Sequence, residues 1–353
     1  MLHDVLEVLR TQNRFLITTH VRPDGDAIGS QLALGLALEK LDKQVTLLNS
    51  DPVPHSLDWL PGSGAIKAFR GEVVFREAVA CADAILVVDT NALNRLGKPL
   101  RRPVQSSKAV KVLIDHHTEP EIWFDHSYIL TAAAATGQLV YEIICGLDPN
   151  LIDAEIATAL YTAIMTDTGS FRFSAVTADV HRMTADLLER GGLPASEVYQ
   201  NIYQSRPPMW ARLVSMVLGT LTLLYDGELA YMVITQRMFS ETNTEYDDAE
   251  GMADFAMSVH GVRVVIIFTE SRKGVKISFR SVGEIAVDGW ARAFGGGGHP
   301  NAAGAFLAAS LDEVIDRVLH SASRHLGYVS QSFEVTLSQE DEAYLSALTS
   351  LQG

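Results

Sequence analysis

The stretch Thr18–Gly29 reads TTHVRPDGDAIG and places one imidazole and two carboxylates within seven residues, directly after an apolar run. Residues 15–17 predict a short buried strand, and the helical spacing of apolar residues over 27–41 predicts a helix. Residues 20–26 are then a strand-to-helix loop. In a parallel α/β sheet such a loop lies at the carboxyl edge of the strands, where these sheets bind ligands.

Asp24 and Asp26 alternate with a glycine in this loop, so their carboxylates are expected to lie close together. Two close carboxylates repel each other unless a proton or a cation lies between them. His20, four residues upstream, favours a metal ion over a proton. The alternative is a helix N-terminus that carries Asp residues, which stabilise helices generally.

Length and charge limit the classes of protein to be considered. A chain of 353 residues exceeds what one hydrophobic core usually supports, so we expect two domains. The formal net charge of −15 argues against a general nucleic-acid coat protein, which would be basic. A small phosphorylated substrate stays compatible with this charge, because metal ions and a few arginines can reverse the field inside one site.

Cys81 and Cys145 are the two cysteines of the chain, and neither belongs to a CxxC pattern. A disulfide scaffold and a cysteine zinc site are therefore not expected. The N-terminal residues carry early acidic side chains and no continuous apolar core, which does not fit a secretory signal. No apolar run has the length of a membrane span. We expect a soluble protein of the cytoplasm with no membrane partner.

Further strands are predicted at residues 45–48, 84–88 and 109–114, and the last two end directly in Asp89-Thr90-Asn91 and Asp115-His116-His117. Helical spacing returns at 136–144, 154–165 and 178–189, and Asp167 lies in the turn between the last two helices. Strands that alternate with helices predict an α/β fold with a doubly wound, mostly parallel sheet. Core packing does not explain why polar residues follow the strands at the same end.

After Ser205-Arg206-Pro207-Pro208, which resembles a connector, the pattern changes to strands joined by short turns. Hairpins are predicted from 220–225 with 229–235 and from 263–269 with 275–280, followed by helices at 285–294 and 311–325. We therefore expect a second, smaller α/β domain. The predicted organisation is a catalytic domain at 1–190, a linker at 191–210, a substrate-binding domain at 211–330 and an amphipathic tail at 331–353.

Six residues form a mixed set of carboxylates and imidazoles that suits two divalent cations. They are His20, Asp24, Asp26, Asp89, His116 and Asp167. Manganese is the leading candidate, and Asp89 is the natural bridging carboxylate. Two cations of this kind can generate a hydroxide and stabilise an in-line displacement at phosphorus, which is phosphoester hydrolysis.

Asp115 and His117, which flank His116, have other expected roles. Asp115 is a candidate to orient the His116 imidazole, as metal-bound histidines usually require. His117 is a candidate acid or phosphate contact. Taken alone, adjacent histidines at a strand end are more often simply solvated.

The second domain contains a positively biased stretch in an acidic chain. Lys276, Ser278 and Arg280 alternate with apolar residues, so they are expected on one face of a strand. A solvated edge strand that lysines protect is an equally good reading of this stretch. The run Gly295–Gly298, followed by His299, lets backbone N–H groups approach an anion, although a bare glycine run can also be a flexible linker.

These motifs resemble the DHH phosphoesterase superfamily, in which Asp115-His116-His117 is the naming motif. The likeness extends through HVRPDGDAIGS, VVDTN, IDHH and TDTGSFRF, and through GGGGHPNAAG in the second domain, which resembles the DHH-associated domain. TDTGSFRF and SFRS are most similar to the NrnA-type branch of oligoribonucleases and 3′-phosphoadenosine 5′-phosphate phosphatases.

The resemblance implies two Mn²⁺ ions, with Mg²⁺ or Co²⁺ as possible substitutes, bound by the six residues named above, and His117 facing the scissile phosphate. It implies a hydrolase that converts short RNA oligonucleotides to mononucleotides and removes the 3′-phosphate of 3′-phosphoadenosine 5′-phosphate. A homodimer is plausible for the class. The implied substrate contacts are Asn91, Arg95, Ser278, Arg280, Gly296, Gly297, Gly298 and His299.

Three other functions stay open. A phosphodiesterase for linear or cyclic dinucleotide signals would have the same catalytic domain, although no sensory module accompanies it here. An inorganic pyrophosphatase fits less well, because that branch lacks the SFRS and extended glycine-loop context. A regulatory nucleotide-binding protein on a degenerate fold would be favoured by the loss of a metal ligand, and all six are present in this sequence.

Overall fold

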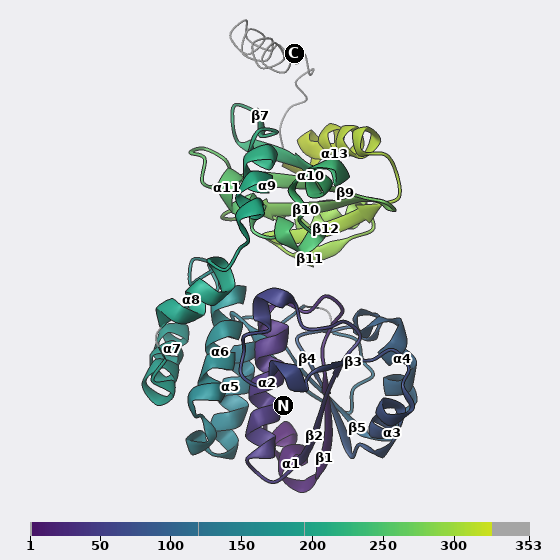
Figure 1. Ribbon diagram of the computed structural model, residues 1–353, viewed down its shortest axis with the longest axis vertical. Coiled ribbons are helices and arrows are strands. Elements are labelled where there is room, and N and C mark those ends of the chain that lie inside the picture. The colour runs from purple at the N-terminus through teal and green to yellow at the C-terminus, as the bar shows by residue number, and fades with distance from the viewer. Residues whose placement is uncertain (1, 119, 194, 327–353) are drawn as a thin grey trace, which may run out of the picture. The chain divides into compact units, whose positions relative to one another are not determined.

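The computed structural model describes residues 2–118, 120–193 and 195–326. The chain divides into two compact units, Met1–Pro207 and Pro208–Gly353 (Figure 1). The tail predicted at 331–353 lies outside the described residues.

The first unit is built on a six-stranded sheet in the order β3-β2-β1-β4-β5-β6, and all neighbouring strands are parallel. The central strand β1 therefore lies between β2 and β4. This order confirms the doubly wound parallel sheet predicted from the sequence. The strands are β1 (Arg14–Thr18), β2 (Gln44–Asn49), β3 (Lys67–Ala68), β4 (Ala84–Val88), β5 (Val110–Asp115) and β6 (His126–Ile129).

Both faces of this sheet are buried, because successive side chains of a strand point to opposite faces. In β1, Phe15 and Ile17 belong to one hydrophobic cluster, and Leu16 belongs to another. In β4, Leu86 belongs to the cluster of Phe15, and Val87 belongs to the cluster of Leu16. A strand that is buried on both sides appears in the sequence as a continuous apolar run, as residues 84–88 do.

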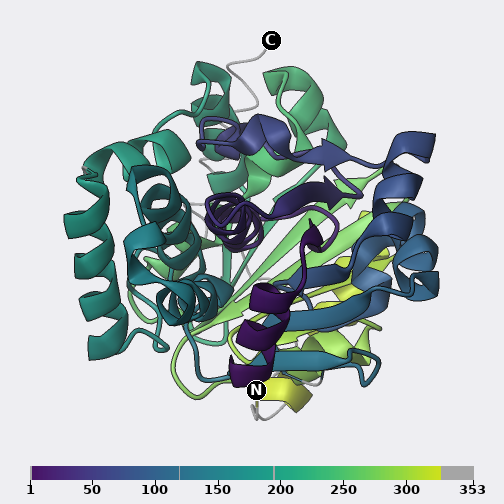
Figure 2. The same ribbon diagram turned by 90° about the horizontal axis from the view of Figure 1, so that it is seen from below.

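Helices cover the two faces unequally. The larger cluster contains α1, α2, α5, α6, α7 and α8, and the smaller contains α3 and α4. Figures 1 and 2 show these two layers, with α3 and α4 in blue on one side of the sheet. The helices are α1 (Leu2–Thr11), α2 (Gly25–Glu39), α3 (Val73–Cys81), α4 (Gly97–Ser106), α5 (Thr136–Leu147), α6 (Ala154–Asp167), α7 (Ala178–Gly191) and α8 (Ala195–Tyr203).

Short 3₁₀ turns connect several of these elements. They are η1 (His55–Leu57), η2 (Ser63–Ala65), η3 (Leu93–Leu96) and η4 (Pro149–Leu151). The turn η3 leads directly into α4, so α4 starts close to the end of β4 in the sequence. The helix α8 lies within the stretch 191–210 that the sequence predicts as a linker.

The helices α2 and α6 pack closely because α2 has no side chain at Gly29. A Cβ atom at Gly29 would lie 2.4 Å from the backbone oxygen of Ala159 and 2.9 Å from the Ala163 Cβ atom. The close contact brings the first turn of α2, with Asp24 and Asp26, next to the last turn of α6, with Asp167. The glycine therefore has a part in assembling the polar cluster described below.

The second unit contains a six-stranded mixed sheet in the order β11-β12-β10-β9-β8-β7. Only β8 and β9 are parallel within it. This sheet confirms the smaller α/β domain and both predicted hairpins. Its strands are β7 (Thr222–Leu224), β8 (Leu229–Ile234), β9 (Val264–Ser271), β10 (Gly274–Ser281), β11 (Gly297–His299) and β12 (Ala302–Leu307).

Helices pack on both faces of this second sheet. One cluster joins Val264, Ile266 and Phe279 to α12 and α13, and the other joins Val265 and Ile267 to α9, α10 and α11. The predicted helix at 285–294 is shorter in the structure, and α9, α10 and α11 were not predicted. These helices are α9 (Pro208–Leu218), α10 (Gln236–Thr242), α11 (Met252–Met257), α12 (Asp288–Ala293) and α13 (Leu311–Leu326), with the 3₁₀ turn η5 (Tyr246–Ala249).

Within the described parts of the chain, no helix combines the length and the apolar character that crossing a lipid bilayer requires.

Replacement of Gly29 by Ala tests the packing of α2 against α6. Helix propensity alone predicts that Gly29→Ala stabilises the protein by about 1 kcal/mol. The Ala159 backbone oxygen leaves no space for the added Cβ atom, so we expect the free energy of unfolding to fall by about 1–3 kcal/mol instead. Chemical denaturation measures the difference. Gly64→Ala is the control, because a Cβ atom there meets nothing within 4 Å, and a more stable Gly29→Ala protein would contradict the close packing.

Candidate metal centre

The candidate site lies at the carboxyl edge of the first sheet, where β1 and β4 are neighbours. From β1 the strand order continues to β2 and β3 on one side, and from β4 to β5 and β6 on the other. Ligands bind at such a switch point of an open α/β sheet, because the two neighbouring loops leave the edge in opposite directions. His20 follows β1, Asp89 follows β4 and Asp115 ends β5.

Asp89 is at the centre of the site. Its side chain is almost completely buried, at 2 % exposure. One carboxylate oxygen, Oδ2, lies 3.3 Å from His20 Nε2, and the other, Oδ1, lies 3.7 Å from His116 Nε2 and 3.9 Å from His117 Nδ1. Asp89 has a φ of 57°, a left-handed conformation that is uncommon for residues other than glycine. Such strain persists where the surrounding structure fixes it, and it is frequent at functional sites.

His20 and His116 present the same ring nitrogen to the carboxylates. His20 Nδ1 lies 2.9 Å from the Val21 backbone oxygen, and His116 Nδ1 lies 3.2 Å from the Ala133 backbone oxygen. Because a carbonyl oxygen only accepts hydrogen bonds, Nδ1 carries a proton in both rings. The Nε2 atom of a neutral ring is then an acceptor that faces carboxylate oxygens. Such an arrangement needs a proton or a cation between the two acceptors.

Asp26 and Asp167 complete this side of the site. Asp26 is 1 % exposed, and its Oδ2 lies 3.9 Å from His116 Nε2. Asp167 Oδ2 lies 3.3 Å from the same nitrogen. The backbone N–H groups of Thr136 and Gly137, at the start of α5, donate to Asp26 at 2.6 and 2.8 Å. These two bonds satisfy N–H groups that have no partner within the helix.

Asp24 has two roles in the structure. Its Oδ1 accepts a hydrogen bond from the Ala27 backbone N–H at 3.1 Å and so caps α2. Its Oδ2 lies 3.9 Å from His20 Nε2. The two readings of this residue from the sequence, helix cap and member of a polar cluster, are therefore compatible with each other.

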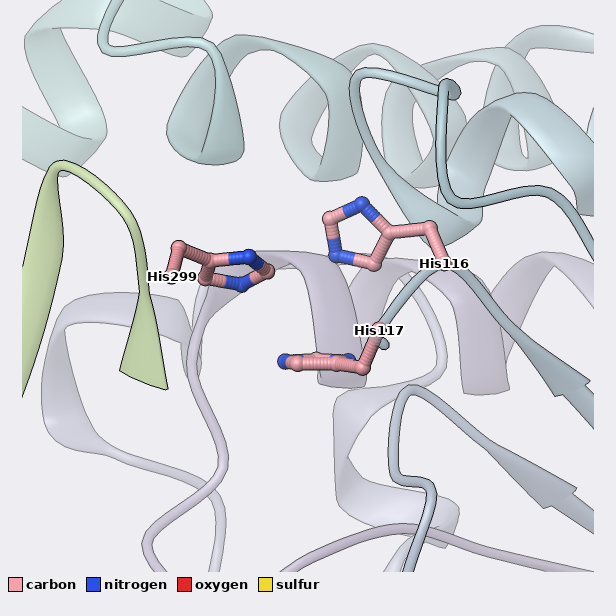
Figure 3. A group of neighbouring side chains, drawn as sticks. All are labelled: His116, His117 and His299. Carbon is pink, nitrogen blue, oxygen red and sulfur yellow. The ribbon is translucent and has the colours of Figure 1, made fainter. Parts of the chain in front are cut away.

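His117 and Asp115 form a separate pair. Asp115 is completely buried, and its Oδ1 accepts a hydrogen bond from His117 Nδ1 at 2.7 Å. The rings of His116 and His117 meet edge to face, with centroids 4.8 Å apart (Figure 3; the third labelled ring, His299, belongs to the second unit). The structure thus differs from the prediction that Asp115 orients His116. Asp115 fixes His117, and the Ala133 carbonyl fixes His116.

The balance of charge in the site is negative. Among the described residues, no lysine or arginine forms an ion pair with Asp24, Asp26, Asp89 or Asp167. Burial and the neighbouring carboxylates raise the pKa of Asp26 well above its ordinary value. Burial and the same neighbours also raise the pKa of Asp167, to about 7, although the charge of His116 opposes this shift.

The pKa values of Asp89, His20 and His117 shift in the direction that favours the charged form of each group. Burial would raise the pKa of Asp89, but the hydrogen bond from His20 and the charges of the imidazoles outweigh burial and lower it. Burial would lower the pKa of His20, but the carboxylates of Asp89 and Asp24 outweigh burial and raise it. Burial would also lower the pKa of His117, but the carboxylates of Asp115 and Asp89 outweigh burial and raise it. In the absence of a metal ion, protons therefore compensate the negative charge.

The donor atoms fit divalent cations. The set His20, Asp24 and Asp89 and the set Asp26, Asp89 and His116 each offer ligand atoms that lie within 4.8 Å of one another. Asp89 belongs to both sets, so it can be shared by two ions. Imidazole nitrogen with several carboxylate oxygens is a donor set that suits Mn²⁺ and related divalent cations. A divalent ion would also supply the positive charge that lysine and arginine do not.

Two residues that contact the site were not predicted from the sequence. The Thr136 hydroxyl donates to Asp89 Oδ1 at 2.9 Å, and the Ser30 hydroxyl donates to Asp26 Oδ1 at 3.1 Å. The signal for Thr136 was the run of alanines at 132–135 before Thr136-Gly137, since small residues at a helix start leave its backbone N–H groups accessible.

The other predicted residues of this unit lie at the same edge. Arg95 belongs to η3, and its positive charge opposes the rise in the pKa of His20 and of His117. The Arg95 backbone oxygen accepts a hydrogen bond from Val21 at 2.8 Å, which ties η3 to the loop after β1. The Asn91 side chain donates to the Thr118 backbone oxygen at 2.5 Å, so it holds the loop that follows His117.

The predicted residues of the second unit come together on one face of its sheet. In the strand register Arg280 and His299 are both paired with Ala302, and Ser278 and Gly297 are both paired with Gly304. Paired residues of antiparallel strands point to the same face. This face of β10, β12 and β11 thus combines a cation, an imidazole and a hydroxyl around the small residues of β12.

The glycine run is part of a hairpin and does not form a flexible linker. Gly298 has a φ of 146°, and a Cβ atom there would lie 2.5 Å from the Ala302 backbone oxygen. The close approach of β11 to β12 therefore requires glycine at this position, and it places His299 at the end of β11.

Comparison with known proteins gives consistent results for both units. The DHH family, N-terminal domain, matches residues 14–164, and the DHHA1 domain matches residues 226–326. The chain is 34 % identical to the bifunctional oligoribonuclease and PAP phosphatase NrnA of Thermus thermophilus, over 91 % of this chain and 93 % of the relative. It is 25 % identical to NrnA of Bacillus subtilis, over 90 % and 96 %.

A solved structure shares the fold over most of the chain. An exopolyphosphatase-related protein from Bacteroides fragilis superimposes with a TM-score of 0.86 at 29 % identity, and the match covers 92 % of this chain and 97 % of the other.

The raised pKa values predict how the stability of the metal-free protein depends on pH. The raised pKa of Asp167, about 7 against an ordinary 3.8, contributes stability below 3.8 that is lost as the pH rises through about 7. The raised pKa values of His20 and His117 contribute stability below 6.5 that is lost above it. The lowered pKa of Asp89 contributes stability that is lost only as the pH falls below its ordinary value of 3.8.

We therefore expect the thermal midpoint in chelator to fall between about pH 6 and about pH 8. Excess Mn²⁺ should raise the midpoint more at the upper end of this range, because the cation replaces the protons. Scanning calorimetry measures both effects, and Asp167→Asn, the control, should show a shallower fall. A midpoint in chelator that stays level or rises over this range would contradict the charge balance described here.

Proposed function

We propose, because the chain belongs to the DHH family of phosphoesterases, that it hydrolyses short RNA oligonucleotides to mononucleotides and removes the 3′-phosphate of 3′-phosphoadenosine 5′-phosphate. The observation that carries this proposal is the buried cluster around Asp89, in which acceptor atoms face one another and, among the described residues, no lysine or arginine forms an ion pair with the carboxylates. The NrnA relatives, whose names state both activities, support the choice of substrates.

We assign two divalent cations to the cluster. His20 and Asp24 would hold one, Asp26, His116 and Asp167 would hold the other, and Asp89 would be shared between them. When bound, two such ions act as Lewis acids that activate water and stabilise the charge that develops on a phosphoryl group. Mn²⁺ is the proposed native ion, with Mg²⁺ or Co²⁺ as substitutes.

The protein's own groups have distinct proposed roles in this reaction. The carbonyl oxygens of Val21 and Ala133 hold the proton of the neutral His20 and His116 rings on Nδ1, so that Nε2 is the ring nitrogen that would face a cation. His117 directs Nε2 away from Asp115, where it can donate a hydrogen bond to a phosphate oxygen. The raised pKa of His117 favours the protonated ring that this role requires. Arg95 adds a second positive charge near these imidazoles.

The second unit is proposed to bind the nucleotide. The face with Ser278, Arg280 and His299 offers a guanidinium and hydrogen-bond donors for phosphate oxygens. The backbone of Gly296, Gly297 and Gly298 is free of side chains, so phosphate or sugar groups can approach it closely. Asn91 stays a proposed contact of the first unit. We further propose that the protein works in the cytoplasm as a homodimer.

Product analysis tests the proposed function. Purified protein with Mn²⁺ is incubated in parallel with a 5′-phosphorylated RNA dinucleotide, 3′-phosphoadenosine 5′-phosphate, a cyclic dinucleotide and pyrophosphate. We expect mononucleotides from the first two substrates and no reaction in excess chelator. Cleavage of the cyclic dinucleotide alone would replace the proposal by a signalling phosphodiesterase. Cleavage of pyrophosphate alone would replace it by a pyrophosphatase, and nucleotide binding without any cleavage would indicate a regulatory protein.

Asp115 is predicted to act through His117. In Asp115→Asn the side chain loses the negative charge that positions His117 and favours its protonated form. We therefore expect kcat for the RNA dinucleotide to fall by about 10- to 100-fold, with little change in KM. The pH profile should shift to lower pH as the pKa of His117 falls. Asp58→Asn, which affects the exposed pair with His55, is the control. An unchanged pH profile would remove Asp115 from this role.

Arg280 is predicted to contribute mainly to substrate binding. We expect Arg280→Ala to raise KM for 3′-phosphoadenosine 5′-phosphate by about tenfold or more, which corresponds to the loss of one charged hydrogen bond. Arg272→Ala is a matched control, because Arg272 is an exposed arginine of the turn between β9 and β10. Equal KM values for both variants and the unchanged protein would contradict the assignment.

A further inference from the structure

A second group of charged residues lies on α4, on α3 and on the segment before α3, and it shares no residue with the candidate metal centre. Two adjoining depressions of about 560 and 630 Å³ share Lys98 and Arg102 in their walls. Arg101 completes the first depression, and Arg70 and Arg76 line the second. We call this surface the α4 basic groove. Its five cations stand out in a chain that has 28 basic and 43 acidic residues.

The cations of the α4 basic groove are poorly compensated by carboxylates. Among the residues that the structure describes, no Asp or Glu lines either depression. Within the described residues, none of the five forms an ion pair, although most surface arginines of α7, α10 and α13 do so. Glu72 accepts a hydrogen bond from the backbone N–H of Arg70 at 2.8 Å, and backbone hydrogen bonds, together with the charge of Arg70, lower the pKa of Glu72. All five side chains are exposed.

The spacing along α4 makes this arrangement costly in the absence of a ligand. Lys98, Arg101 and Arg102 are three and four positions apart, so they lie on one face of the helix. Like charges at these spacings destabilise a helix by a few tenths of a kcal/mol per pair. A bound anion removes this repulsion. Arginine in particular binds phosphate through two parallel hydrogen bonds.

The position of the groove relates it to the metal centre of the same unit. The helix α4 begins at the carboxyl edge of the sheet, where Gly97 packs against Val21 and Ser50. Arg70 directly follows Phe69, whose N–H bonds to Asn49 at the end of β2. Both walls of the groove therefore start from the edge that carries His20 and Asp89. A polyanion that reaches this edge can continue along α4.

We propose that the α4 basic groove binds the phosphodiester backbone of single-stranded RNA that is longer than the oligonucleotides hydrolysed at the metal centre. The choice of RNA among polyanions rests on the proposed function. Two adjoining depressions with five cations suit several consecutive phosphates better than a single one. The groove captures longer RNA by its backbone, without reading its sequence.

Binding of RNA in chelator tests this proposal without hydrolysis. Fluorescence anisotropy measures the affinity of a labelled single-stranded RNA of about twenty nucleotides for the full chain at several salt concentrations. We expect Arg101→Glu with Arg102→Glu to weaken binding by about tenfold or more, and to lower the slope of log affinity against log salt by about 0.7 for each lost phosphate contact. The milder Arg101→Gln with Arg102→Gln should show a smaller loss in the same direction.

A control with the same change of charge separates the groove from net charge. Arg10→Glu with Arg182→Glu changes two exposed arginines on α1 and α7, which belong to the helices on the opposite face of the sheet. This control should bind the long RNA within about twofold of the unchanged protein. A loss of affinity equal to that of the groove variant would overturn the proposal, as would full affinity in the groove variant.

Two further outcomes identify the ligand and separate this proposal from the proposed function. Hydrolysis of the RNA dinucleotide should be unchanged in the groove variant, and its loss would show that the groove belongs to the catalytic site. Polyglutamate at equal charge should compete poorly, and full displacement of RNA by it would overturn the assignment to nucleic acid. If no variant hydrolyses RNA but the groove variant alone loses affinity, the proposed function fails and this proposal stands.

Discussion

The approach of two hydrogen-bond acceptors, the Nε2 atom of a neutral imidazole and an anionic carboxylate oxygen, is the interaction on which the structure of the first unit depends. It occurs between His20 and Asp89 and again between His116 and the carboxylates of Asp26, Asp89 and Asp167. The backbone carbonyls that bind Nδ1 fix both rings in this orientation. Such contacts are unfavourable without a positive charge between the atoms, so the geometry of the site requires a proton or a cation at this position.

The fold supplies this arrangement by bringing together residues that are far apart in the sequence. The strand order places the loops after β1 and β4 beside each other, and β5 adds the DHH tripeptide. The close contact of α2 with α6, which Gly29 permits, adds Asp167, and the start of α5 supplies hydrogen bonds to Asp26. Asp89 accepts a left-handed backbone conformation at the point where these elements meet. Stability and site geometry thus depend on the same contacts.

Much of this could be predicted from the sequence because it depends on local patterns. Continuous apolar runs at 84–88 and 109–114 identify strands buried on both faces, and the polar residues after them identify the edge of the sheet. The pairing of Asp115 with His117 could not be derived in this way, since it depends on the orientations of two adjacent rings, which tertiary contacts such as that of His116 with the Ala133 carbonyl help to fix. Nor could α4 be predicted, because its apolar residues are few and Pro103 interrupts the pattern. The α4 basic groove was missed together with that helix.

The cluster around Asp89 is proposed to bind two divalent cations that share this carboxylate. The most direct test is to measure how many Mn²⁺ ions the metal-depleted protein binds per chain, by equilibrium dialysis, and to repeat the measurement with Asp89→Asn. The account predicts two ions for the unchanged protein and the loss of tight binding at both positions in the variant, because both donor sets contain Asp89. A protein that binds no Mn²⁺, or a variant that still binds both ions, would contradict it.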